Sequence, residues 1–293
     1  MYDIIIIGCG PAGMTAAIYA KRANKKVLIL EKETIGGQMA SAPFIENYPG
    51  YERISGSELA NNMFSQVENL GVEIELEEVL EIKDGKIKKV ITDSNTYETK
   101  AIIISTGSKY NLLGIPNEDN LIGSGIHFCV ACDGAFYKDK IVAVIGGGNS
   151  AAINAIALSD ICKKVIIFQN LETLTAEKVL VNKIEEIDNI EVKYNSKIEE
   201  FVGDKELQAI KLTNEIVEVA GAFISIGLKP QSGIFKELLD VNEYGYIETN
   251  NCVTEKEGIF VAGDCRNKEV RQVTVATSDG TIAAMKAIEY LNQ

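Results

Sequence analysis

The stretch YDIIIIGCGPAG, residues 2–13, decides the fold of this chain. Its apolar run is short, rich in β-branched residues and closed by a glycine, which is typical of a buried strand. The sequence that follows predicts a helix over residues 14–23 and a second strand over residues 27–30, directly before Glu31. A glycine loop between a strand and a helix, with an acid about 20 residues further on, is the dinucleotide-binding pattern in its full context.

The spacing of the loop glycines has a physical reason. Gly8 permits the tight turn, Gly10 lets the backbone approach a pyrophosphate, and Gly13 lets the helix pack on the strand. With Pro11 and Ala12 they are predicted to contact the dinucleotide, whose pyrophosphate would lie at the helix N-terminus. The acid after the second strand would accept hydrogen bonds from a ribose. A purely structural glycine turn would not need that acid.

The same pattern occurs a second time. The sequence predicts a strand over residues 141–145, the loop GGGNSA over residues 146–151, a helix to about Ser159, and a strand over residues 164–168. Gly8 to Glu31 spans 31 − 8 = 23 positions, and Gly146 to Gln169 spans 169 − 146 = 23. This internal repeat predicts an α/β fold with two Rossmann-like, three-layer ββα nucleotide-binding domains.

The second copy differs from the first where a ribose would bind. Gln169 replaces the acid, and residues 169–175 contain no Lys or Arg and a single acid, Glu172. NADP needs a cation for its 2′-phosphate, and NAD needs an acid for its 2′-hydroxyl. The loop offers neither clearly, so one interpretation is that the second domain keeps the fold without the ligand.

Two turn-rich segments divide the chain, one over residues 111–120 and one near residues 236–243. A strand over residues 258–264 and a helix from Arg271 to about Tyr290 follow the second of them. We therefore predict a discontinuous first domain, residues 1–112 with 240–293, and a second domain, residues 115–237.

Cys129 and Cys132 form the one C-x-x-C pair of the sequence. Such a pair is a redox dithiol in an intracellular chain, or half of a zinc site when a second pair exists. The only histidine, His127, lies two residues away, and a structural zinc site needs four ligands. We therefore predict a redox dithiol and no metal. The remaining cysteines are predicted to be small buried residues: Cys9, Cys162, Cys252 and Cys265.

Composition narrows the partners and the compartment. The formal net charge of −13 over 293 residues disfavours nucleic acid as a partner. No apolar run approaches the ~18 residues of a membrane span. The N-terminus lacks the basic segment and long apolar run of a signal peptide. We expect a cytoplasmic protein, in which disulfides are mostly catalytic or transient.

Taken together, seven spaced motifs resemble the low-molecular-weight, bacterial-type thioredoxin reductase family. They are residues 8–13, 36–38, 46–50, 129–133, 146–151, 263–264 and 271–272. The resemblance implies a homodimer that holds FAD in the first domain and reduces thioredoxin through the C-x-x-C pair. It implies that Cys132 lies nearer the flavin and Cys129 nearer solvent.

The resemblance also assigns further residues to the cofactor. Asp264 would contact the ribityl chain, Gln272 and Val273 the flavin ring, and Asn47 the isoalloxazine neighbourhood. The other residues of the family motifs and turns expected at the cofactor are Gly37, Gln38, Thr106, Gly107 and Gly263.

One departure from the family concerns the electron donor. NADPH-dependent members carry a basic His-Arg-Arg cluster and a further Arg after the strand that ends here at Phe168, where this chain has Gln169, Asn170 and Leu171. The chain thus most resembles the ferredoxin-dependent flavin-thioredoxin reductases. Two electrons falling from a low-potential ferredoxin to thioredoxin drop by ~130 mV, about 6 kcal/mol. FAD can store the first electron and pass on a pair.

Alternatives remain at this stage. The same enzyme could use NADPH or NADH, the flavin could pass electrons from a small dithiol to oxygen, or the protein could be a flavin-bearing redox sensor. A related ferredoxin–NADP reductase is disfavoured because it would not need the C-x-x-C pair. Asp133 is either the general acid for a leaving thiolate or a helix cap. His127 either tunes the dithiol or is a strand histidine with a backbone partner.

Overall fold

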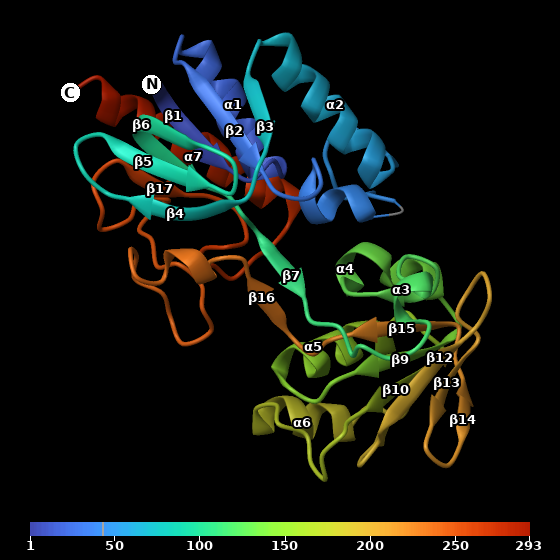
Figure 1. Ribbon diagram of the computed structural model, residues 1–293. Helices are drawn as coiled ribbons and strands as arrows, with labels where there is room; N and C mark the ends of the chain where they lie inside the picture. Colours follow the sequence, from blue (N-terminus) through green and yellow to red (C-terminus); the bar gives the residue numbers. More distant parts are fainter. Residues whose placement is uncertain (43) are drawn as a thin grey trace. The chain divides into compact units, whose positions relative to one another are not determined.

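The computed structural model describes residues 1–42 and 44–293, which form two compact units. Unit 1 comprises Met1–Lys109 and Lys229–Gln293, and unit 2 comprises Tyr110–Leu228 (Figure 1). The chain passes between the units in β7 (Ser108–Tyr110) and β16 (Leu228–Pro230), which pair as a two-stranded sheet.

The second boundary lies earlier than the turn-rich composition predicted. Residues 229–237, which were predicted to lie in the second domain, belong to unit 1. The reason is packing: Phe235 and Leu239 are buried in a core of unit 1 at 1% and 3% exposure. Phe235 ends the short helix η3 (Gly233–Phe235). The polar residues around these two side chains had suggested a linker.

Unit 1 is built on one mixed sheet. Its strands run parallel in the order β3-β2-β1-β6-β17, and β5 and β4 continue antiparallel from the first half of β6. The strands are β1 (Tyr2–Ile7), β2 (Val27–Glu31), β3 (Glu73–Leu76), β4 (Val79–Lys83), β5 (Lys88–Thr92), β6 (Thr96–Ile104) and β17 (Ile259–Val261). The helices are α1 (Pro11–Arg22), η1 (Gly37–Ser41), α2 (Gly56–Asn69) and α7 (Val273–Leu291).

Strand alternation explains the layers of unit 1. Successive side chains of a strand point to opposite faces. Ile4 and Ile6 pack with the helices α1, α2 and α7, whereas Ile5 and Ile7 pack with Val79 of β4 and its neighbours. Because both faces of β1 are buried, its sequence is an unbroken apolar run rather than an alternating one.

Unit 2 repeats the arrangement. A parallel sheet in the order β11-β10-β9-β15-β8 stands beside an antiparallel sheet in the order β12-β13-β14. The strands are β8 (Ile126–His127), β9 (Ile141–Ile145), β10 (Lys164–Phe168), β11 (Ile190–Lys193), β12 (Ile198–Val202), β13 (Ala209–Leu212), β14 (Ile216–Glu218) and β15 (Gly221–Ile224). The helices are α3 (Glu118–Leu121), α4 (Val130–Asp133), η2 (Gly134–Tyr137), α5 (Asn149–Ser159) and α6 (Lys178–Glu185).

The parallel sheet of unit 2 is also buried on both faces. Val144 and Ile167 pack with α5, whereas Ile145 and Ile166 pack with residues of β12 and β13. The predicted fold class, two Rossmann-like α/β domains, is therefore confirmed. Among the strands that were not predicted are β4 and β14, whose mixed polar sequences carry little periodicity.

Candidate functional sites

The first glycine loop of unit 1 is tight on one side and open on the other. A Cβ on Gly8 would lie 2.4 Å from the carbonyl oxygen of Ser105, and one on Gly13 would lie 2.0 Å from that of Gly8. A Cβ on Gly10 would meet nothing within 4 Å. Gly10 is the N-cap of α1 and Pro11 its first residue, with no side-chain cap. The loop therefore offers open backbone at a helix N-terminus, where anions bind.

Glu31 lies at the end of β2 against this loop. Its Oε2 accepts a hydrogen bond from the backbone N–H of Cys9 at 2.7 Å, and its Oε1 accepts one from Glu33 at 2.9 Å. These two bonds fix the carboxylate beside the loop. A carboxylate has about four acceptor positions, so this one can still accept ribose hydroxyls.

The start of η1 lies beside the same loop. The N–H of Gly36 donates to the carbonyl of Cys9 at 2.9 Å, and a Cβ on Gly37 would lie 3.6 Å from Cα of Gly10. Gln38 donates through Nε2 to the backbone carbonyl of Ser108 and stands 3.3 Å from its Oγ. Gly37 thus joins the glycine loop, while the Gln38 amide anchors η1 to β7.

Thr106 and Gly107 follow β6 and hold the returning chain. Oγ1 of Thr106 donates to the carbonyl of Gln231 at 2.6 Å, and the carbonyl of Gly107 accepts from the N–H of Gln231 at 2.9 Å. Gly107 has φ +68°, which glycine adopts without strain. In the structure Thr106 and Gly107 hydrogen-bond the backbone of Gln231. Their contact with the cofactor stays a prediction.

The C-terminal segment of unit 1 packs onto the start of α1. A Cβ on Gly280 would lie 2.2 Å from the carbonyl of Ala12, and one on Gly263 would lie 3.1 Å from Cβ of Ala12. The N–H of Gly263, at φ +79°, donates to Oδ2 of Asp279 at 3.1 Å. Close packing of α7 on α1 therefore brings Gly263 to the glycine loop.

A buried cluster of charges follows Gly263. Asp279, 3% exposed, accepts hydrogen bonds from Arg266 (Nε, 3.1 Å; Nη2, 3.2 Å) and from Nζ of Lys268 at 3.1 Å. Nζ of Lys268 also lies 2.9 Å from Oδ1 of Asp264. Burial alone would lower the pKa of Arg266, but the hydrogen bonds that its guanidinium donates to Asp279 raise it above its ordinary value. The cluster fixes the segment that carries Asp264.

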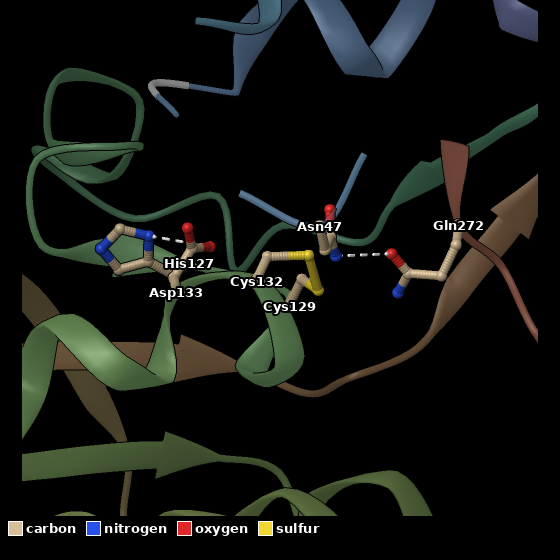
Figure 2. The surroundings of a disulfide bond; sticks show 6 residues. All are labelled: Asn47, His127, Cys129, Cys132, Asp133 and Gln272. Atoms are coloured by element: carbon tan, nitrogen blue, oxygen red, sulfur yellow. Dashed lines mark hydrogen bonds and ion pairs between the residues drawn. A yellow bond between two sulfur atoms is a disulfide. The ribbon is translucent and has the colours of Figure 1, made fainter. Parts of the chain in front are cut away.

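Asn47 and Gln272 meet within unit 1. Nδ2 of Asn47 donates to Oε1 of Gln272 at 3.1 Å (Figure 2). Gln272 is the N-cap of α7 and Val273 its first residue, and the Gln272 side chain makes no cap bond. The structure therefore brings these two predicted cofactor residues together at a second helix N-terminus.

The C-x-x-C pair lies at the start of α4 in unit 2. Cys129 is its N-cap, and the N–H groups of Cys132 and Asp133 donate to the carbonyl of Cys129 at 3.2 and 3.0 Å. The two sulfurs are joined as a disulfide with a Cα–Cα distance of 5.3 Å (Figure 2). That distance is ordinary for a disulfide, so one helical turn holds the pair without distortion of the backbone.

The side chain of Asp133 faces His127. Its Oδ2 lies 3.2 Å from Nδ1 of the imidazole, and Nε2 lies 2.7 Å from the hydroxyl of Tyr137. Asp133 is the N-cap of η2 but makes no side-chain cap bond, so the helix-cap interpretation is wrong. The partners of His127 are side chains, so the expectation of a backbone partner is wrong as well.

The other cysteines are buried, as predicted. Burial raises the pKa of Cys9 to about 12, of Cys162 to about 11 and of Cys252 to about 12, and it raises that of Cys265 too. They therefore remain thiols at neutral pH and are poor nucleophiles.

The side chain of Gln169 covers the second glycine loop. A Cβ on Gly147 would lie 2.2 Å from Nε2 of Gln169, which is 3% exposed. That Nε2 donates to the carbonyl of Thr173 at 2.9 Å, and Oε1 accepts from the N–H of Asn170 at 3.1 Å. Thr175 donates from its N–H to the carbonyl of Gly147 at 2.7 Å. Both ends of the Gln169 amide are thus used within the loop.

Residues 2–280 match the family model described as pyridine nucleotide-disulphide oxidoreductase. The chain belongs to this family. This oxidoreductase is 40% identical to the "34.2 kDa protein in rubredoxin operon" of Clostridium pasteurianum, over 99% of this chain and 97% of that protein. It is 41% identical to the thioredoxin reductase of Bacillus subtilis, over 100% and 96%. Among solved structures, the thioredoxin reductase of Streptococcus pyogenes matches with a TM-score of 0.96 at 40% identity, over 100% and 98%.

FAD is the cofactor of this family, as the sequence predicted. Unit 1 fits such a dinucleotide. Its loop is open at Gly10 but closed at Gly8 and Gly13, and the carboxylate of Glu31 stands at its edge.

Sequence reasoning missed two groups of this oxidoreductase. Asp279 was not singled out, although an Asp-Gly pair inside a predicted helix is unusual enough to notice. Tyr137 was not singled out because nothing in the sequence pairs it with a histidine ten positions earlier.

Within the described residues, 1–42 and 44–293, no three His, Cys, Asp or Glu side chains are grouped so as to hold a metal ion. No helix in this part of the chain is long and apolar enough to cross a membrane.

Proposed function

We propose that this oxidoreductase reduces the disulfide of thioredoxin through Cys129 and Cys132. The observation that carries the proposal is the disulfide at the start of α4, next to the Asp133–His127 pair, of which the imidazole is buried. The names of the relatives from Bacillus subtilis and Streptococcus pyogenes support thioredoxin as the substrate. Bound FAD supplies a pair of electrons that opens the disulfide.

The residues of unit 1 hold the cofactor in this proposal. The loop over residues 8–13 takes the pyrophosphate at the N-terminus of α1, and Glu31 takes the ribose of the adenosine. Gly37 and Gly263 line the same loop, as their contacts with Gly10 and Ala12 support. The further assigned positions are Gln38, Asn47, Thr106, Gly107, Asp264, Gln272 and Val273.

The dithiol then acts by exchange. A thiolate of the reduced pair attacks the thioredoxin disulfide, one S–S bond breaks and a mixed disulfide forms. The second cysteine displaces the reduced thioredoxin and re-forms the Cys129–Cys132 bond. Two electrons and two protons thus leave the enzyme for thioredoxin. Asp133 is proposed as the group that gives a proton to a leaving thiolate.

Two donors are proposed, each on a different observation. The family description and the relatives named thioredoxin reductase favour a pyridine nucleotide, NADPH or NADH, over ferredoxin. The geometry of the second loop favours ferredoxin as the second candidate. A 2′-phosphate beside Gln169 would lose charge-assisted hydrogen bonds worth roughly 1.5–3 kcal/mol each, and each 1.4 kcal/mol is about tenfold in affinity.

An anaerobic reduction assay tests the function and the donor together. The holoenzyme is mixed with thioredoxin and with NADPH, NADH or reduced ferredoxin, and both flavin absorbance and thioredoxin thiols are followed. Loss of flavin absorbance with micromolar NADPH would identify the nucleotide as the electron donor. Loss of flavin absorbance with reduced ferredoxin alone would identify ferredoxin as the donor. Thioredoxin that stays oxidised with every donor would overturn the proposed function. Oxygen consumption with a small dithiol would instead identify a dithiol oxidase.

Cysteine variants give the matched control. Cys129→Ser and Cys132→Ser should each abolish thioredoxin reduction, because exchange needs both sulfurs. Cys162→Ser, in the same unit but buried with a raised pKa, should keep normal turnover. Near-normal turnover in either C-x-x-C variant would contradict the mechanism.

A homodimer and a cytoplasmic location remain predictions from the resemblance and the composition. Sedimentation of the holoenzyme measures the first, and a monomer at assay concentration would contradict it.

A further inference from the structure

Three side chains of unit 2 form a hydrogen-bonded chain: His127, Tyr137 and Asp133, the last with a side chain that is 13% exposed. His127 and Tyr137 are 6% and 7% exposed, and each ring nitrogen of His127 has a side-chain partner. These are the Tyr137 hydroxyl at 2.7 Å and the Asp133 carboxylate at 3.2 Å (Figure 2). Because the N–H of Asp133 donates to the carbonyl of Cys129, the same residue is tied to the redox turn by its backbone.

Packing fixes both rings of this chain. The rings of His127 and Tyr137 each lie with their centroids 5.6 Å from that of Phe223 on β15. A Cβ on Gly221 would lie 2.3 Å from the Tyr137 ring, so only glycine leaves room for the tyrosine at this position of β15. The hydroxyl therefore has a defined place from which to reach Nε2.

The direction of the hydrogen bonds follows from Tyr137 and Asp133. Burial, aided by the charges of Asp133 and Glu206, raises the pKa of Tyr137 to about 12. The hydroxyl keeps its proton, and because the Asp133 carboxylate only accepts hydrogen bonds, the Nδ1 that faces it carries a proton. In this Nδ1–H tautomer Nε2 accepts from the Tyr137 hydroxyl. That N–H points at Oδ2 of Asp133 and donates to it.

We propose that His127 is a positioning residue: held by Tyr137 in the Nδ1–H tautomer, it orients the Asp133 carboxyl group for proton exchange with the dithiol. The proposal rests on the proposed function. When the disulfide opens, the S–S bond breaks, two electrons arrive from reduced FAD, and each sulfur that ends as a thiol takes up one proton. One of these protons passes through the Asp133 carboxylate, which takes it up from solvent before giving it to a sulfur, and the other comes directly from solvent.

The tautomer can be observed directly because His127 is the only histidine of the sequence. The holoenzyme is labelled with ¹⁵N-histidine, and the two ring nitrogens are assigned by NMR at neutral pH. We expect a protonated Nδ1 and an unprotonated Nε2. Tyr137→Phe keeps the ring but removes the hydroxyl, so Nε2 should gain protonated character. An Nε2–H tautomer in the unaltered protein, or an unchanged spectrum in Tyr137→Phe, would overturn the proposal.

A pair of substitutions separates positioning from packing. The amide of His127→Asn can place a donor where Nδ1 lies, whereas that of His127→Gln reaches toward the place of Nε2. We expect kcat for thioredoxin to be about tenfold lower in His127→Gln than in His127→Asn, as one lost hydrogen bond to a charged group predicts. KM should stay unchanged. Equal kcat values in the two variants, when both retain FAD and thermal stability, would contradict the positioning role of His127.

The two proposals fail in different ways. Absence of thioredoxin reduction by the unaltered holoenzyme would sink the proposed function, while the NMR tautomer would still stand. An Nε2–H tautomer of His127 together with normal thioredoxin turnover would contradict only the positioning role of His127.

Discussion

The two glycine loops of this molecule have the same strand–loop–helix pattern. They differ in the residue at the end of the strand that follows the helix, which is Glu31 in unit 1 and Gln169 in unit 2. In unit 1, Glu31 binds the N–H of Cys9 and leaves the space over Gly10 open. In unit 2, Gln169 folds over Gly147 and uses both ends of its amide on its own loop. The glycines alone therefore do not make a nucleotide site. The residue that follows the second strand decides whether the loop presents an acceptor to a ribose.

The largest expected effect is a glycine substitution made in both loops. Gly8→Ala places a Cβ 2.4 Å from the carbonyl of Ser105 at φ +105°, and Gly146→Ala places one 2.5 Å from that of Ser225 at φ +126°. Each should destabilise its own unit by about 4 kcal/mol, through backbone strain and overpacking. Only Gly8→Ala should lose FAD, which is measured as flavin absorbance per chain. Equal flavin loss in both variants would break the comparison.

A slightly smaller effect is expected from the charge cluster that only unit 1 has. Asp279→Asn leaves Arg266 and Lys268 buried without their shared carboxylate, and breaking such a pair costs about 3 kcal/mol. The thermal midpoint and the FAD content should both fall. Glu269→Gln, an exposed acid of the same segment, is the control and should change neither. An unaltered midpoint in Asp279→Asn would show that the cluster contributes nothing to unit 1.

An exchange at the end of the second strand comes next. Glu31→Gln removes a charged acceptor and should weaken FAD binding by about 2 kcal/mol, some thirtyfold in Kd. Gln169→Glu makes the reverse change in unit 2 and should leave flavin content as it is. Equilibrium titration of the flavin-free proteins with FAD measures both. A Kd within a factor of two of the unaltered protein in Glu31→Gln would contradict the role given to this carboxylate.

The smallest effect concerns the connections that follow β3 in unit 1 and β11 in unit 2. In unit 1 the buried Glu77 accepts from Thr92, Asn95 and Tyr97. Burial works against its charge, but these three bonds prevail and lower the pKa of Glu77 below its ordinary 4.5. The corresponding connection of unit 2, residues 194–197, has no acid.

A lowered folded-state pKa fixes the sign of the pH dependence. The stabilisation by Glu77 is fully present above the unfolded pKa of 4.5 and is lost as pH falls through the lower folded value. Glu77→Gln should therefore reduce the free energy of unfolding by about 1 kcal/mol at pH 7. The difference from the unaltered protein should shrink below about pH 4.5. Urea titrations at pH 7 and pH 4 measure it, and a difference that grows on acidification would refute this account.

Much of this architecture follows from local sequence. The apolar runs before Gly8 and Gly146, and their equal spacing to the ends of the second strands, predict both Rossmann-like units. The C-x-x-C spacing predicts the disulfide. These features are local because a turn, a strand and a helix start are each set by neighbours along the chain.

Other features depend on residues far apart in sequence. Phe235 joins the core of unit 1 because of partners such as Ile102, which its own polar surroundings do not reveal. Asp279 of α7 is brought to Arg266 and Lys268 by the fold of the segment before α7, eleven to thirteen positions earlier in the chain. Tyr137 reaches His127 because Gly221, more than eighty positions later, leaves room for its ring. The spacing of residues along the chain does not reveal such long-range contacts.

The order of synthesis has consequences for a unit made from both ends of the chain. Unit 2 is one continuous segment, and its sheet can form as soon as residues 110–228 have left the ribosome. Unit 1 must wait, because β6 pairs with β17 and α1 packs against α7, so its core stays incomplete until residues 259–291 appear. During that interval the apolar face of β1 and β2 that packs against helices lacks the part of its cover that α7 supplies, and exposed apolar surface of this kind makes chains aggregate or need chaperones. A nascent chain from which residues 1–228 have left the ribosome, but residues 259–291 have not, should therefore hold a protease-resistant unit 2 together with a unit 1 that is still cleaved.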